Sequence, residues 1–142
     1  MLIGSYNHQL DQKNRFRIPA KFKTGLGEEL VITKGTHNSL YLMSKESMEK
    51  NVFEKMQSVS MFDEPLQKSF RLLLSSAHEV ESDAQGRILM PSALKQHANI
   101  TKNIVFVGVG SRVEIWAEEE WQKYSSGIDF DAEMETLAKS GV

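Results

Sequence analysis

A short basic segment near the N-terminus carries the side chains best suited to binding chemistry. The local charge of residues 11–23 is +4, because five cations face the single acid Asp11. The cations are Lys13, Arg15, Arg17, Lys21 and Lys23. Arginine can donate two parallel hydrogen bonds to guanine O6 and N7, and both cation types can pair with phosphates. The segment therefore has the chemistry of a nucleic-acid contact, although an unevenly charged, solvated surface would have the same composition.

The basic segment has a counterpart later in the chain. Aligning DQKNRFRIPAKFK (11–23) with DAQGRILMPSALK (83–95) matches Asp11 with Asp83 and Arg15 with Arg87, and the prolines and final lysines also coincide. Further on, LVIT (30–33) matches IVFV (104–107), and LYLM (40–43) matches VEIW (113–116). The chain is therefore predicted to contain two copies of one unit, with a period of about 72 residues.

Each Asp-x-x-x-Arg segment has the composition of a tight turn between two strands. Asp11 and Asp83 can accept hydrogen bonds from backbone N–H groups ahead of them, which favours the start of a turn. Three residues later stand Asn14 and Gly86, the residue types that best tolerate a left-handed backbone. Each arginine then begins the returning strand, and a proline follows where a short helix can start. A second hairpin in each copy is expected to turn at residues 35–39 and 110–111.

The arginines of these turns have two possible roles. Each could contact DNA from an exposed hairpin tip, or each could pair with its own aspartate and hold the turn in shape. The two copies also differ around the arginine, because Gln85 and Leu89 stand where the first copy has Lys13 and Arg17. The first turn is therefore the stronger candidate for contacting DNA.

Helical segments are expected between and after the two copies. Ser44 can cap a first helix and Asp63 a second, each with apolar residues at helical spacing. An acidic helix is expected from Glu118 to about Ser125, and the tail beyond Gly127 is expected to be acidic and partly helical or frayed. We therefore divide the chain into a first repeat (1–58), a connecting helix (59–76), a second repeat (77–127) and an acidic C-terminal tail (128–142).

Several functional classes find little support in the composition. The chain has no cysteine, which removes thiol nucleophiles and thiolate metal sites. The four histidines lack the spacing of a helical metal pair, and His78, which aligns with Tyr6, is expected in the core. Glu118, Glu119 and Glu120 are consecutive and splay around a helix. We therefore expect no catalytic residue, no metal, no cofactor, no small-molecule substrate and no enzymatic activity. The chain also shows no secretory segment and no membrane span, so we expect a soluble, intracellular protein.

The order of these features resembles the bacterial MraZ family. The features are two Asp-x-x-x-Arg turns, each followed by an apolar strand and a proline, two helices between the copies, and a closing strand in each half, LYLM or VEIW. The resemblance extends from Ile3 to about Tyr124. It implies an α+β fold of two tandem swapped-hairpin, AbrB-like β-barrel halves with peripheral helices. It also implies a ring-shaped homo-oligomer, commonly an octamer, which binds short direct repeats in double-stranded DNA. Such regulators usually repress their own division and cell-wall operon, and the expected location is the cytoplasm and nucleoid.

The resemblance points to one set of DNA-binding residues and one set of turn-forming residues. The DNA-binding set is Arg15, Lys13, Asn14, Arg17, Arg87 and Lys21, and the turn-forming set is Asp11, Asp83 and Gly86. Asn14 departs from the glycine that is common in the family, but it tolerates the same backbone conformation. The main alternative function is an antitoxin-like protein-interaction module on the same fold, and a small-ligand barrel is a third possibility.

Overall fold

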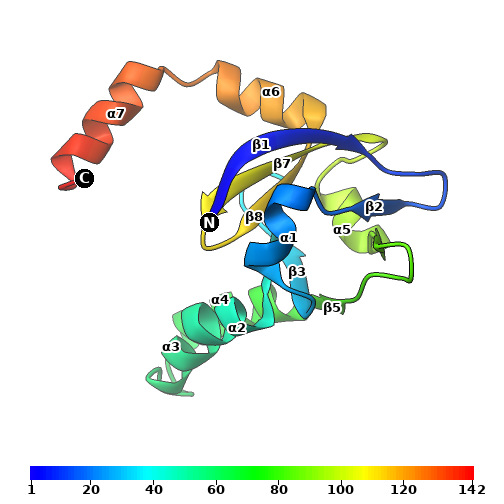
Figure 1. Cartoon of the computed structure of the whole chain (residues 1–142). Coiled ribbons are helices and arrows are strands. Elements are labelled where there is room, and N and C mark those ends of the chain that lie inside the picture. The colour runs from blue at the N-terminus through cyan, green and yellow to red at the C-terminus, as the bar shows by residue number, and fades with distance from the viewer.

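Both copies of the repeat fold into the same order of elements in the computed structural model, which describes residues 1–142 (Figure 1). The first copy contains β1 (Leu2–Gln9), β2 (Arg15–Arg17), α1 (Ala20–Leu26), β3 (Leu30–Lys34) and β4 (Leu40–Ser44). The second copy contains β5 (His78–Val80), β6 (Arg87–Leu89), α5 (Ser92–His97), β7 (Asn103–Gly110) and β8 (Val113–Ala117). This mixture of helices and strands confirms the predicted α+β class.

The strands of the two copies are interleaved. The larger sheet has six antiparallel strands in the order β1-β7-β8-β4-β3-β5, and a separate two-stranded ribbon joins β2 to β6. Within a copy, only β3 with β4 and β7 with β8 are paired; β1 pairs with β7, β3 with β5, β4 with β8 and β2 with β6 across the copies. Neither copy could satisfy its backbone hydrogen bonds alone.

One hydrophobic core lies between the sheet, the ribbon and the short helices α1 and α5. Its members come from both copies, and Phe16 of β2, Phe22 of α1 and Phe106 of β7 are among its largest buried side chains. Phe106 contacts Phe16 with ring centroids 5.8 Å apart and lies edge-on to His8 at 5.2 Å. The core therefore fixes the ribbon relative to the sheet through aromatic packing.

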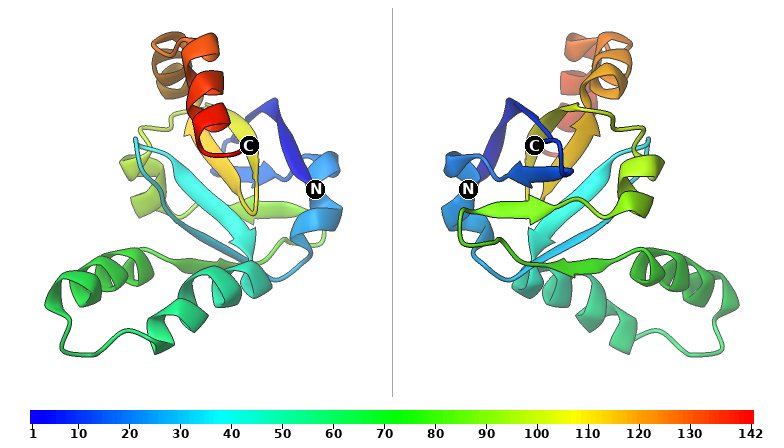
Figure 2. Two further views of the ribbon diagram at one scale, coloured as in Figure 1. Left: turned by 90° about the vertical axis from the view of Figure 1, so that its left-hand side faces the viewer. Right: turned by 90° about the vertical axis from the view of Figure 1, so that its right-hand side faces the viewer.

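Two helices between the copies form a hairpin that projects from the body. The first runs through α2 (Lys45–Met48), the π-helical turn η1 (Glu49–Phe53) and α3 (Glu54–Gln57), and the second is α4 (Glu64–Ser75). Ser44 accepts a hydrogen bond from the Ser47 N–H and Asp63 accepts one from the Leu66 N–H, which confirms both predicted caps. Figure 2 shows the hairpin leaving the sheet on one side.

The apolar side chains of the helical hairpin are divided between the body and solvent. Met48 packs with Val31 and Met43 on the outer face of the sheet, and Val52 and Leu74 pack against them. Towards the tip of the hairpin, apolar side chains are exposed, and Phe62 is 87% exposed. Phe53, Met61 and Leu66 are exposed as well, and so is Leu72 nearer the base of α4. Stripe residues near the base of the hairpin therefore pack against the sheet, whereas Phe53 and Leu66 of the predicted stripes are exposed.

The C-terminal region contains the acidic helix that the sequence predicts and a second helix in the tail, which was expected to be partly helical or frayed. Helix α6 (Glu118–Ser126) forms as expected, and a second helix, α7 (Phe130–Lys139), follows it and extends away from the sheet (Figure 1). Asp129 caps α7 by accepting a hydrogen bond from the Asp131 N–H.

His78 is exposed rather than buried, because it lies on the edge strand β5, and the core prediction for this histidine was wrong. None of the helices is both long enough and apolar enough to cross a bilayer.

Candidate nucleic-acid interface

The two Asp-x-x-x-Arg segments form turns with matching hydrogen bonds. In the first, the Asp11 N–H donates to the Arg15 carbonyl at 2.9 Å, and Asp11 Oδ1 accepts from the N–H groups of Lys13 and Arg15 at 2.9 Å. In the second, Asp83 makes the equivalent bonds with Arg87 and Gln85.

The backbone conformation of both turns agrees with the prediction. Asn14 has a φ of 60° and Gly86 a φ of 78°. Both residues therefore occupy the left-handed region that the turn requires.

Each arginine is held by the aspartate of its own turn. Arg15 Nε donates to Asp11 Oδ2 at 2.8 Å, and Arg87 Nε donates to Asp83 Oδ2 at 2.9 Å. The Arg15 and Arg87 side chains are only 24% and 26% exposed. The turn-stabilising role is therefore present in both copies. The Nη groups of both arginines make no hydrogen bond within the chain, so they are available to a ligand.

A lysine from each copy lies near the turn of the other. Lys95 Nζ donates to Asn14 Oδ1 at 2.8 Å, and the Met90 N–H donates to the Asn14 carbonyl at 2.8 Å. Lys23 approaches the second turn, since its Nζ lies 4.0 Å from the position that a Cβ on Gly86 would take. Lys95 was absent from the predicted site residues, although its alignment with Lys23 was the feature that could have identified it.

The ribbon brings the arginines of the two turns together. In its register Phe16 lies opposite Ile88, both are buried, and Arg17 lies opposite Arg87. Since side chains alternate along a strand, Arg15, Arg17 and Arg87 share the outer face with Leu89, which is 62% exposed. The right-hand view of Figure 2 shows β2 and β6 running side by side across this face.

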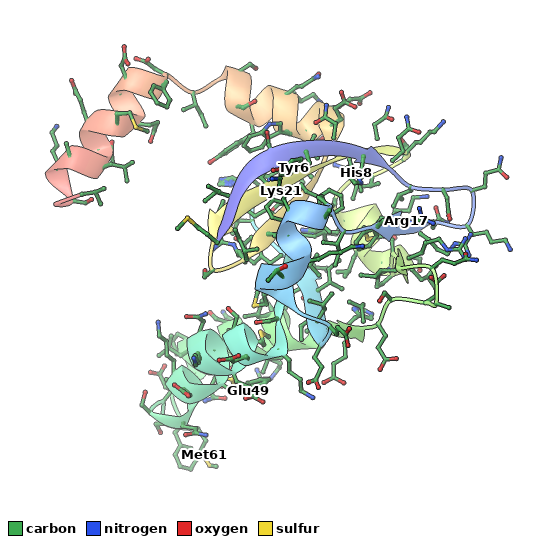
Figure 3. The ribbon with its side chains drawn as sticks, in the orientation of Figure 1. Tyr6, His8, Arg17, Lys21, Glu49 and Met61 are labelled. Atoms are coloured by element: carbon green, nitrogen blue, oxygen red, sulfur yellow. The ribbon has the colours of Figure 1, made fainter.

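The remaining predicted cations are exposed around the first turn. Lys13, Arg17 and Lys21 are exposed and make no ion pair or side-chain hydrogen bond within the chain. Figure 3 labels Arg17 beside β2 and Lys21 on α1. The structure therefore brings all six predicted DNA-binding residues to the ribbon and its flanks, with the unpaired cations concentrated in the first copy.

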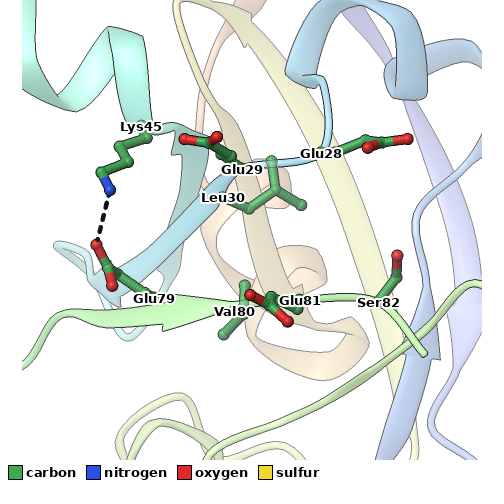
Figure 4. A pocket seen from close by; sticks show the side chains of 8 residues that line it. All are labelled: Glu28, Glu29, Leu30, Lys45, Glu79, Val80, Glu81 and Ser82. Carbon is green, nitrogen blue, oxygen red and sulfur yellow. Dashed lines mark ion pairs between the residues drawn. The ribbon is translucent and has the colours of Figure 1, made fainter.

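A second surface has the opposite charge. A cavity of about 610 Å³ is lined by Glu28, Glu29, Leu30, Lys45, Glu79, Val80, Glu81 and Ser82 (Figure 4). Lys45 Nζ lies 3.4 Å from Glu79 Oε1, and the hydrogen bond with Glu79 raises the pKa of Lys45 above its usual value. Four carboxylates against one lysine repel phosphates, so this cavity does not extend the basic surface. Nowhere in the structure do three His, Asp or Glu side chains lie close enough to hold a metal ion.

The turn hydrogen bonds predict an acid-sensitive contribution to stability. The N–H of Arg15 holds the pKa of Asp11 below its usual 3.8, and the N–H of Arg87 does the same for Asp83. A carboxyl whose pKa is lower in the folded state stabilises the fold above its unfolded pKa, and that contribution is lost as the pH falls through the folded pKa. Urea midpoints of the wild type and of an Asp11→Asn/Asp83→Asn variant should therefore differ at neutral pH and converge as the pH falls through the lowered pKa values of the two carboxyls. A constant difference across the pH range would contradict this explanation.

Comparison with known proteins places the chain in a family. The family model described as "MraZ protein, putative antitoxin-like" matches residues 1–68 and again 73–140. The chain belongs to the MraZ family. The sequence-based resemblance is thereby confirmed, and both MraZ matches contain one Asp-x-x-x-Arg turn.

Curated MraZ relatives match nearly the whole chain. "Transcriptional regulator MraZ" of Caldanaerobacter subterraneus subsp. tengcongensis is 44% identical over 133 residues, which are 94% of this chain and 92% of the relative. The proteins of the same name from Clostridium beijerinckii and Clostridium tetani are 43% and 39% identical, and both alignments cover all of both chains. The similarity to these two relatives therefore extends over the full length of both chains.

Proposed function

We propose that this chain regulates transcription by binding double-stranded DNA through the outer face of the β2–β6 ribbon. The observation that carries the proposal is the gathering of both Asp-x-x-x-Arg turns, from segments far apart in the sequence, on one exposed and cation-rich face. A two-stranded antiparallel ribbon fits the major groove of B-DNA. The relatives named "Transcriptional regulator MraZ" support regulation of transcription as the biological role.

In the proposed complex the basic residues have different tasks. Arg15, with free Nη groups, contacts a base edge in the groove, and Asn14 holds the turn that presents it. Lys13, Arg17 and Lys21 contact phosphates, which positions the protein but gives little sequence preference. The second turn contributes Arg87 and has fewer cations around it.

We further propose that several subunits act together in a ring-shaped homo-oligomer, commonly an octamer. One copy of the basic segment offers few cations, so a single subunit binds weakly and with strong salt dependence. Several subunits on short direct repeats raise the effective concentration. The exposed apolar side chains of the helical hairpin support such subunit contacts. Native mass spectrometry measures the ring size directly.

The proposal also includes the DNA that is bound, the regulatory outcome and the type of β-barrel. The operator is a set of short direct repeats upstream of the chain's own division and cell-wall operon, the outcome is repression, and the location is the cytoplasm and nucleoid. The cross-copy pairing of β1 with β7 and of β5 with β3 supports a swapped-hairpin, AbrB-like arrangement. The two family matches support a repeat boundary near the one proposed, with repeats at 1–58 and 77–127.

A gel-shift titration tests DNA binding. Wild-type protein is titrated with DNA from upstream of its operon and with a shuffled duplex at two salt concentrations, and saturable, selective, salt-weakened binding is expected. Replacing Lys13, Arg17 and Lys21 by glutamine should reduce the salt slope by about 0.9 for each lost phosphate contact. The matched control replaces Lys34, Lys123 and Lys139, which are exposed, lie outside both the ribbon and the helical hairpin, and change the net charge equally. Equal affinities and equal salt slopes of the two triple variants would show that DNA does not bind at the ribbon.

An antitoxin-like role in protein binding is the second candidate. The family description favours it, and so does α7, which exposes Phe130, Met134 and Leu137 beside acidic residues. Complete absence of DNA binding by a folded protein would favour this candidate over the first.

A further inference from the structure

The outer face of the ribbon contains a cavity between the two copies. Its volume is about 300 Å³, and β1, the first turn and both ribbon strands contribute to it. The lining residues are His8, Gln9, Asp11, Arg15, Phe16, Arg17 and Arg87. Three of these seven residues are arginines, two from the first copy and one from the second.

The ribbon register creates an uncompensated charge at this cavity. Arg17 and Arg87 lie directly opposite each other in an antiparallel pair, where like charges are destabilising. Asp83 and Asp11 offset Arg87 and Arg15, but Arg17 has no acidic partner. Since the Nη groups of Arg15 and Arg87 are free within the chain, the cavity offers several donors and an excess of positive charge.

We propose that this cavity is one phosphate-binding site built jointly by the two copies, in which Arg17 and Arg87 hold the same phosphate group. Arginine pairs with phosphate through two parallel hydrogen bonds, and the planar fork of each guanidinium suits that geometry. His8 and Gln9 add further hydrogen-bond donors at the wall formed by β1. The phosphate relieves the repulsion across the ribbon, so binding and ribbon stability are coupled.

The phosphate can come from two sources. One is the backbone of bound DNA, in which case the inference deepens the proposed function and rests on it. The other is a small organic phosphate, in which case the site acts independently of DNA. Both present the same anionic oxygens, and two experiments distinguish them.

The first experiment measures thermal unfolding of the full chain in sodium phosphate and in sodium chloride of equal ionic strength. The wild type should gain about 2–4 °C in Tm with saturating phosphate. Arg17→Gln should lose most of that gain, and its Tm in chloride should equal or exceed that of the wild type, because the cross-strand repulsion is gone. Arg71→Gln on α4 is the control, since Arg71 is exposed and distant in the fold.

The control variant is needed because phosphate also stabilises proteins without binding a site. A general effect would raise the Tm of all three proteins equally, and that result would overturn the proposal. The same holds if phosphate changes no Tm at all. Neither result depends on DNA, so the failure of this site is distinguishable from the failure of DNA binding.

The second experiment uses operon-upstream duplexes in which single phosphates are replaced by uncharged methylphosphonates. If DNA supplies the phosphate, one methylphosphonate position should lower the affinity of the wild type several-fold relative to the unsubstituted duplex. The same duplex should bind Arg17→Gln as tightly as the unsubstituted duplex does, because that variant has already lost the contact. A phosphate-dependent Tm gain that needs Arg17, with no such linkage in DNA, would support the small organic phosphate as the source.

Discussion

Replacing Arg15 with alanine should lower the DNA affinity that we propose about 10- to 100-fold and leave the oligomeric state unchanged. The loss corresponds to one bidentate contact with a base, which is worth about 1–3 kcal/mol. Arg15 is the right residue because its Nη groups are free and because Lys13 and Arg17 surround it. Fluorescence anisotropy at moderate salt measures the affinity, and native mass spectrometry checks the oligomer.

Arg87→Ala is the matched comparison for Arg15→Ala, since it removes the equivalent arginine of the second copy. Both variants remove an Nε–aspartate hydrogen bond of almost equal length, so the turns should lose similar stability. The effect on DNA should be smaller for Arg87→Ala, because Gln85 and Leu89 replace the neighbouring cations in its copy. Equal losses of affinity would mean that the two turns contact DNA equally. Wild-type affinity of Arg15→Ala would leave Arg15 with the turn-stabilising role alone.

Replacing Phe106 with alanine should lower the free energy of unfolding by about 3–5 kcal/mol. Phe106 is fully buried and packs against Phe16, so its loss leaves a cavity between the sheet and the ribbon. The ribbon should then lose its fixed position, and DNA affinity should fall even where the protein remains folded. Urea unfolding followed by circular dichroism measures the first effect, and anisotropy measures the second.

An exposed phenylalanine provides the control for Phe106→Ala. Phe130 is 69% exposed on α7, and Phe130→Ala should change the free energy of unfolding by no more than about 0.5 kcal/mol. A loss below about 1 kcal/mol for Phe106→Ala would show that this ring is not the main link between sheet and ribbon.

Local features of the fold were predictable because they depend on residues close in sequence. The left-handed conformations of Asn14 and Gly86 and the helix caps at Ser44 and Asp63 follow from local backbone chemistry, and all four are present. The two copies were visible because equivalent positions in equivalent surroundings select similar residues.

Contacts between the copies were not predictable from the sequence pattern. Nothing in the alternation of β2 or β6 specifies that Arg17 faces Arg87, or that Lys95 reaches Asn14 across the ribbon. His78 was misplaced for the same reason. Its alignment with Tyr6 correctly relates β5 to β1, but exposure depends on which strands and helices cover that position. The contacts of the candidate site that join the two copies therefore depend on long-range strand pairing, which the sequence pattern does not specify.

The interleaving of the two copies also has a consequence for synthesis on the ribosome. Strand β1 emerges first, but its partner β7 is made near the end of the chain. Until then β1 remains an open strand edge and the residues that will pack against Phe106 stay uncovered, a state that favours aggregation. The first half cannot fold and wait for the second, since β3 and β4 also need β5 and β8. Folding is therefore expected to be slow and to depend on completed chains, which makes premature termination costly for this protein.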